Sequence, residues 1–381
     1  FKLINRNFYL NSSYKTFFGD GWTLQTGGSY TFNGNDLGIF TDEIDNTENS
    51  IHLKLRLKKA FSNKVSLNFG AEHFYTDFNE QFQSVNTFKY GFNGNLSAAF
   101  AETDVFFSNS LALKAGLRAE YNALSEESTF SPRLSMAYKP GEKGQFSIAY
   151  GSFYQNPLND YLKFNNGLAN EQASHFIANY QYIHNGRTFR AEAYHKNYKN
   201  LVTFDTELPL GNTNFGNGGF GEASGLDIFY RDNKSIKNMD YWVSYSYIDT
   251  RRKYQNFPVE AAPQFVNRHT FSVVNKYWID KLKSQVGTSY TFGSGRPYTN
   301  PNVGGFLSEK TKPYHNLSVN WAYLIDPQKI LYFSVNNVLA RQNVFGYDYA
   351  ANPNENGLFE RQAVVPNADM FFFVGFFWTI S

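Results

Sequence analysis

The chain has 381 residues, no cysteine and a formal net charge of +2 at pH 7. The absence of cysteine excludes a disulfide scaffold and thiolate metal sites, and the near-neutral charge argues against a nucleic-acid-binding surface. Aromatic residues make up 19 % of the chain, yet the mean hydropathy of −0.48 is too polar for a helical membrane protein. Together these values fit a membrane β-barrel, in which half of each strand is apolar and the rest of the chain is polar.

Apolar and polar residues alternate with a period of two through nearly the whole chain, which predicts β-strands. The alternation is clearest at 51–58, 65–72, 111–121 and 317–325. The predicted strands are about 10 to 16 residues long, at or above the roughly 9–11 residues that cross a bilayer. A soluble β-sandwich also alternates, but it points its polar residues outward and its strands are usually shorter.

The predicted connections between these strands are alternately short and long. Short turns are expected at 19–21, 62–64, 107–110, 140–144, 184–187, 233–237, 280–283 and 326–329. Long polar loops are expected at 34–49, 79–87, 124–130, 156–170, 205–220, 251–267, 295–312 and 346–367. Outer-membrane barrels have short periplasmic turns and longer extracellular loops. The pattern therefore favours such a barrel over a soluble all-β protein with irregular loops.

The last predicted strand, 368–381, has the sequence ADMFFFVGFFWTIS. One of its sides is entirely apolar, at Met370, Phe372, Val374, Phe376, Trp378 and Ile380. Such a face would aggregate in water but suits a wall that faces lipid, so Phe372, Phe376 and Trp378 are interpreted as part of the barrel-closing strand. Counted back from a periplasmic C-terminus, the chain has 17 strands and Phe1 lies at the outer surface. Single-chain barrels normally have an even number of strands, so at least one strand is expected upstream.

Several segments resemble, in order, the C-terminal barrel of TonB-dependent outer-membrane receptors of the Bacteroidota type. They are AAFAE (98–102), LALKAGLRAEY (111–121), SPRLSMAY (131–138), FSIAYGSFYQNP (146–157), AEAYHKNYKNLV (191–202), GEASGLDIFYRD (221–232), GSGRPYT (293–299), VNNVL (335–339) and the aromatic last strand. The resemblance implies an all-β, antiparallel, transmembrane up-and-down β-barrel in a Gram-negative outer membrane. About 17 strands of a probable 22 would be present.

The resemblance also implies a function. Such receptors import scarce ligands (siderophores, cobalamin, oligosaccharides or peptides) with energy supplied through TonB, which contacts an N-terminal plug domain. Residues 1–381 are expected to be barrel throughout, so TonB would act through a plug portion missing from this chain. The bilayer and the imported ligand are the other expected partners, and a surface lipoprotein would be a further one. Two alternatives stay open: a receptor-derived barrel with a structural or assembly role in an outer-membrane complex, and a passive porin.

Charged residues on the polar sides of the strands are expected to face the lumen. There they could pair with a plug, guide an anionic ligand or balance one another across strands, and mutual balance is the favoured interpretation. The residues concerned are Lys54, Arg56, Glu72, Arg118, Glu120, Arg190 and Glu192.

Aromatic, amide and arginine residues in the predicted outer loops are candidates for ligand binding, because they suit stacking on sugar rings or flat chelates. Tyrosine also anchors barrels at the membrane boundary, and for any single residue that interpretation is favoured. The candidates are Tyr154, Gln155, Asn156, Tyr161, Phe215, Arg251, Tyr254, Arg296, Tyr298 and Tyr347, with Asn212 beside Phe215. The sequence contains neither a GxSxG nucleophile motif nor a HExxH pair, so no enzyme, cofactor or metal site is predicted.

Overall fold

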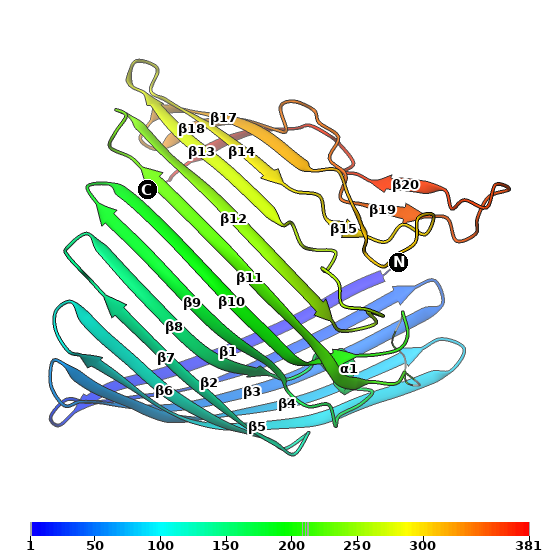
Figure 1. Ribbon diagram of the computed structural model, residues 1–381, viewed down its shortest axis with the longest axis horizontal. Coiled ribbons are helices and arrows are strands. Elements are labelled where there is room, and N and C mark those ends of the chain that lie inside the picture. Colours follow the sequence, from blue (N-terminus) through cyan, green and yellow to red (C-terminus); the bar gives the residue numbers. More distant parts are fainter. Residues whose placement is uncertain (1, 208, 210, 212, 381) are drawn as a thin grey trace.

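The computed structural model describes residues 2–207, 209, 211 and 213–380. Phe1 and Asn212, on which the sequence carried expectations, lie outside these residues. The described chain is dominated by one antiparallel sheet of 17 strands, and the predicted all-β fold and strand count are confirmed. Figure 1 shows the strands side by side in a curved sheet, with the chain doubling back at the end of each strand.

Each strand of the sheet pairs with the strand before it and the strand after it, except at the two ends. The strands are β1 (Lys2–Phe18), β2 (Trp22–Ile39), β3 (Asp42–Ala60), β4 (Val65–Gln83), β5 (Thr87–Phe106), β6 (Leu111–Asn122), β7 (Glu127–Tyr138), β8 (Gly144–Gln155), β9 (Glu171–His184), β10 (Arg187–Thr203), β11 (Gly216–Asp232), β12 (Met239–Lys253), β13 (His269–Ile279), β14 (Ser284–Gly293), β17 (Tyr314–Asp326), β18 (Lys329–Asn336) and β21 (Phe371–Trp378). Among the described strands, β1 pairs with β2 alone and β21 with β18 alone, so the sheet is not closed.

The remaining elements lie in the connections. Loop 156–170 contains the short helix α1 (Asn159–Leu162), and residues Asp280–Leu282 form one 3₁₀ turn. Two small hairpins, β15 (Pro297–Tyr298) with β16 (Glu309–Lys310) and β19 (Gly346–Tyr349) with β20 (Arg361–Val364), stand apart from the main sheet. In the described part of the chain, no helix has the length and apolarity that crossing a membrane would need.

All eight predicted short turns are confirmed, and they share one edge of the sheet, at the left in Figure 1. One two-residue turn joins β9 to β10 through Asn185 and Gly186, whose φ angles are 47° and 70°. Two consecutive positive φ angles define the hairpin turn that an Asn-Gly pair favours. In another turn, Asp232 accepts hydrogen bonds from the Ser235 hydroxyl and from the backbone N–H groups of Lys234 and Ser235, and these bonds hold its pKa well below the usual range.

The long loops predicted at 34–49 and 79–87 are wrong. Strands β2 and β3 continue through the first segment and are joined by residues 40–41, while β4 and β5 continue to residues 84–86. These four strands are 18 to 20 residues long, beyond the predicted 10 to 16. The loop at 124–130 is also shorter than predicted, because β7 begins at Glu127. Backbone hydrogen bonds can extend a strand into water without apolar side chains, so polar composition alone does not mark a loop. The five later loops are long, as predicted.

The strand register assigns every side chain of the sheet to one of two faces. Across β3 to β6, Lys54 lies opposite Glu72, Glu72 opposite Ala98, and Ala98 opposite Glu120. Side chains alternate along a strand, and following the register through β7, β8 and β9 places Arg190 and Glu192 on this same face. We call it the charged face. The opposite, apolar face carries Leu53 and Leu55 on β3, Leu113 and Leu117 on β6, and Phe372, Val374, Phe376 and Trp378 on β21.

Candidate functional site

The charged face carries a network of ion pairs centred on Glu72. Its carboxylate lies 2.5 Å from Lys54 Nζ and 2.5 Å from Nη1 of Arg118, and Nε of Arg118 donates to Glu120 at 2.7 Å. The four side chains come from β3, β4 and β6. The Glu72 side chain is 7 % exposed, so the carboxylate itself is largely removed from water, whereas Lys54 is 44 % exposed. Four of the seven charges predicted from the sequence are therefore brought together by the sheet.

The network continues towards β7 and borders a polar cavity of about 250 Å³. Lys114 Nζ lies 3.3 Å from Glu102, and Arg133 stacks over the Phe153 ring at 4.8 Å. Glu102 and Arg133 were not among the predicted residues, although their alternation with apolar neighbours placed them on the same side of their strands.

Each carboxylate of this network faces at least one cation, which supports the interpretation that the charges balance one another across the strands. Arg56 donates to Asn68 at 2.8 Å, and Arg190 pairs with Glu192 of its own strand at 2.9 Å.

Loop 156–170 reaches across the charged face from β8 and β9 to strands near the start of the sheet. Lys163, directly after α1, pairs with Glu80 of β4 at 2.7 Å, and Asn159 donates to Glu48 of β3 at 3.2 Å. In sheet order these partners lie four or more strands away from the loop's own strands. The contact therefore places the loop across the charged face, at the edge opposite the short turns (Figure 1).

Below this loop, apolar side chains form what we call the rim cluster. Its buried members are Phe78, Phe92, Leu162, Leu168 and Val202, and Leu124, Tyr161, Phe204 and Phe215 pack against them. The cluster joins β4 and β5 to the loops that follow β8 and β10. Burial of these side chains fixes the loops over the face, because each fully buried large side chain contributes about 1.5–3 kcal/mol.

Three predicted ligand-binding residues lie in or beside the rim cluster. The Tyr161 ring lies 6.0 Å from that of Phe215, and Gln255, next to Tyr254, donates to the Tyr161 hydroxyl at 3.2 Å. Burial raises the pKa of both Tyr161 and Tyr254. These rings therefore hold the loops to one another. No local pattern in the sequence predicted this contact between loops that are far apart in the chain.

A second group gathers at the two small hairpins, and we call it the tyrosine–arginine cluster: Tyr298, Tyr347, Tyr349 and Arg361. The rings of Tyr298 and Tyr347 lie 4.8 Å apart, and the Arg361 guanidinium stacks over Tyr347 at 4.4 Å. A hydrogen bond with Tyr298 raises the pKa of Arg361. The sequence predicted Tyr298 and Tyr347 but missed Arg361. The cluster joins aromatic surface to a fixed positive charge, a combination that suits anionic or aromatic ligands.

The other candidates do not join these groups. Tyr154 and Gln155 end β8, and Asn156 accepts a hydrogen bond from Asn122 at 3.3 Å. Arg251 is exposed opposite Glu222 and lies on the same side of the sheet as the apolar face. Arg296 donates to Asn267 at 2.9 Å and lines a cavity of about 270 Å³. Among the described residues, His, Asp and Glu form no group of three that could hold a metal ion.

The family comparison decides the class of protein. Residues 2–338 match the family described as "TonB dependent receptor-like, beta-barrel". The chain belongs to this family. The barrel fold inferred from alternation and the predicted outer-membrane location are thereby confirmed. No curated protein sequence matches the chain.

Solved structures of receptors and transporters share the fold. The copper transporter OprC has a TM-score of 0.73 at 12 % identity, with 98 % of this chain and 65 % of that chain covered. The ferric citrate transporter FecA gives 0.72 at 12 % identity, with 98 % and 62 % covered. The ferric-catecholate import receptor Fiu from E. coli K12 gives 0.70 at 11 % identity, with 98 % and 64 % covered. The receptor barrel thus spans less than two thirds of the length of these structures.

Proposed function

We propose that this chain is the barrel of an outer-membrane receptor that imports a scarce ligand actively, with energy delivered through TonB. The family match over residues 2–338 carries the proposal. Because the chain spans less than two thirds of the similar structures, import would be an activity of a whole receptor, with TonB acting through a plug portion. The charged face would line the lumen, and the apolar face would meet lipid.

The rim cluster favours import over passive diffusion. A porin needs an open aqueous passage, whereas here loop 156–170 crosses the charged face and is fixed by the Lys163–Glu80 pair and by buried Leu162. A loop fixed across the face that would line the lumen suits a receptor that captures its ligand. The alternative of a structural or assembly barrel, which a surface lipoprotein would accompany, has no comparable feature in its favour.

The tyrosine–arginine cluster is the part of the outer loops that we propose for ligand contact. It combines stacked rings with the Arg361 guanidinium. Of the ligand classes that such receptors import, siderophores and other anionic metal chelates match this chemistry best. The similar structures include a ferric citrate transporter and a ferric-catecholate receptor, so iron chelates are the first ligands to test. Cobalamin, oligosaccharides and peptides follow.

The test is uptake of radioiron chelates by cells that carry the full-length receptor gene. Accumulation should require the receptor and should stop when TonB is deleted or the proton gradient is dissipated. An Arg361→Gln variant should raise the chelate concentration needed for half-maximal uptake at least several-fold, while Arg251→Gln, at an exposed arginine outside the cluster, serves as the matched control. Receptor-dependent uptake that survives both TonB deletion and uncoupling would show a passive pore and refute active import. If no chelate were taken up but TonB still bound the receptor, the other ligand classes would be tested next. If TonB did not bind the receptor either, the structural alternative would be supported.

A further inference from the structure

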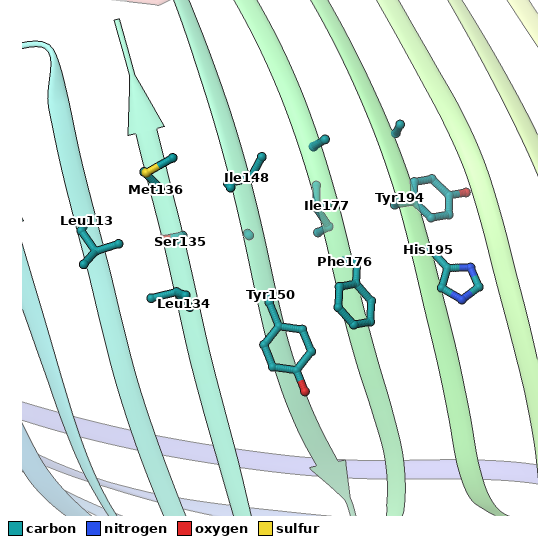
Figure 2. A pocket seen from close by; sticks show the side chains of 13 residues that line it. Leu113, Leu134, Ser135, Met136, Ile148, Tyr150, Phe176, Ile177, Tyr194 and His195 are labelled. Carbon is teal, nitrogen blue, oxygen red and sulfur yellow. The ribbon is translucent and has the colours of Figure 1, made fainter.

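The apolar face has a groove of about 580 Å³ in the wall formed by β6 to β10, which we call the wall groove. Figure 2 shows its lining, with Leu113 and Met136 on one side, Ile148 and Tyr150 in the middle, and Phe176 and His195 on the other side. Its floor is formed by Ile148, Ala178 and Ala193, which lie side by side on β8, β9 and β10: Ile148 is opposite Ala178, and Ala178 is opposite Ala193. Two small side chains in succession leave space that larger side chains fill on neighbouring strands.

Aromatic rows bound this floor at both ends. At one end, the Tyr150 ring lies 4.8 Å from that of Phe176, which in turn lies 6.5 Å from the His195 ring. At the other end, the rings of Phe146 and Tyr180 are 4.5 Å apart, and Tyr180 is 6.2 Å from Phe189. The groove is therefore a bounded recess in the wall.

The His195 end of the groove carries a hydrogen-bonded polar pair. There Nδ1 of His195 is hydrogen-bonded to the Ser224 hydroxyl at 2.8 Å. Three more histidines on the apolar face each bond a hydroxyl of the adjacent strand, His73 with Ser97, His269 with Tyr245 and His315 with Tyr290. Counted from the short-turn end of its strand, His73 is eight residues from Val65 and His195 eight from Arg187, while His269 is ten from Ile279 and His315 eleven from Asp326.

These histidines indicate the depth of the groove. His195 is eight residues from Arg187, where β10 leaves its short turn. At about 3.3 Å per residue and a tilt near 40°, eight residues rise about 20 Å. The apolar band of such barrels is about 25 Å tall. The groove therefore lies within the apolar band, and its polar end is near the outer boundary of the bilayer.

We propose that the wall groove is a binding site for one acyl chain of an outer-leaflet membrane lipid, whose polar head lies at the His195–Ser224 end. An amphiphile matches the groove because the groove has an apolar body and a polar pair at its His195 end. A flexible chain can also fill a narrow recess between protruding rings. This inference rests on the proposed orientation of the apolar face towards lipid, and it is independent of the imported ligand.

The test fills the groove without adding polarity. In the full-length receptor, Ala178→Phe with Ala193→Phe places two rings on the groove floor. Ala71→Phe with Ala101→Phe makes the same change at exposed positions of the apolar face on β4 and β5, outside the groove. Both proteins, with the wild type, are extracted in detergent and compared by native mass spectrometry before and after addition of lipid A, the acylated part of the lipopolysaccharide that forms the outer leaflet.

The wild type and the β4–β5 variant should each bind one lipid. The fraction of the groove variant that carries a lipid should be at least about tenfold lower than in the wild type. Equal occupancy in the groove variant and the wild type would refute the site, as would a wild type that binds no lipid. A wild-type dimer that the groove variant converts to a monomer would identify a second copy as the occupant and overturn the proposal. Should the double variant fail to assemble, Ala193→Leu and Ala101→Leu provide the same comparison with smaller side chains. Normal ligand uptake by a groove variant that has lost the lipid would leave the import proposal intact.

Discussion

At the scale of single residues, Glu72 is the side chain on which most of the charged face depends. Replacing it with glutamine removes the carboxylate that Lys54 and Arg118 share, both at 2.5 Å. Hydrogen bonds to charged groups contribute about 1.5–3 kcal/mol, and Glu72 is nearly buried. We therefore expect Glu72→Gln to lower the free energy of unfolding by about 2 kcal/mol, measured by urea unfolding of the receptor in lipid vesicles.

The matched control is Glu102→Gln, on the neighbouring strand. Glu102 is 24 % exposed and lies 3.3 Å from Lys114, which is 50 % exposed. Pairs this exposed contribute little, typically below about 1 kcal/mol. A Glu102 variant as unstable as the Glu72 variant would mean that charge balance over the whole face matters, and that the Glu72 geometry does not.

At the scale of elements, α1 shows how the outer loops are held in place. Leu162 is 4 % exposed in the rim cluster, whereas Leu158, one turn earlier, is 55 % exposed. Truncating a buried leucine to alanine costs about 2–5 kcal/mol. Leu162→Ala should therefore speed hydrogen exchange throughout 156–170 by at least tenfold and leave the exchange of β8 and β9 unchanged.

Leu158→Ala should leave that exchange near the wild-type rate, because its side chain already contacts water. Hydrogen-exchange mass spectrometry of the receptor in detergent measures both variants. Equal effects at the two positions would show that burial in the rim cluster does not determine the order of the loop.

The elements also show what the sequence could and could not predict. Where one side of a strand is apolar and the other polar, as at 111–121, the alternation predicted the strand and which residues share a face, and the segment around Asn185 and Gly186 predicted a turn. Where a strand extends beyond the bilayer, both of its faces contact water, so apolar and polar residues no longer alternate. For this reason 34–49 was predicted to be a loop, although β2 and β3 continue through it. The site was harder still. Tyr161, Phe215 and Tyr254 meet through loops far apart in the chain, a contact that local patterns do not encode.

At the scale of the whole molecule, the orientation of the two faces decides how the sheet can function. Neighbouring residues Val273 and Val274 of β13 test it directly. Val273 lies on the apolar face, between Val243 and Tyr290, whereas Val274 lies on the charged face, between Trp242 and Ser289. Both are half-buried and identical in type, so only the environment of the added charge differs between their lysine variants.

In the proposed orientation, Val273→Lys puts an ammonium into lipid near the middle of the band, at a cost of about 2–4 kcal/mol. Val274→Lys puts the same group into a polar interior beside Ser289, where its head can stay hydrated, so the cost should be below about 1 kcal/mol. Urea unfolding in vesicles gives both values, and the difference should shrink in detergent micelles, whose apolar layer adapts to a charge more easily. If Val274→Lys were the more damaging of the two, the faces would be reversed, and with them the proposals for the lumen and for the wall groove.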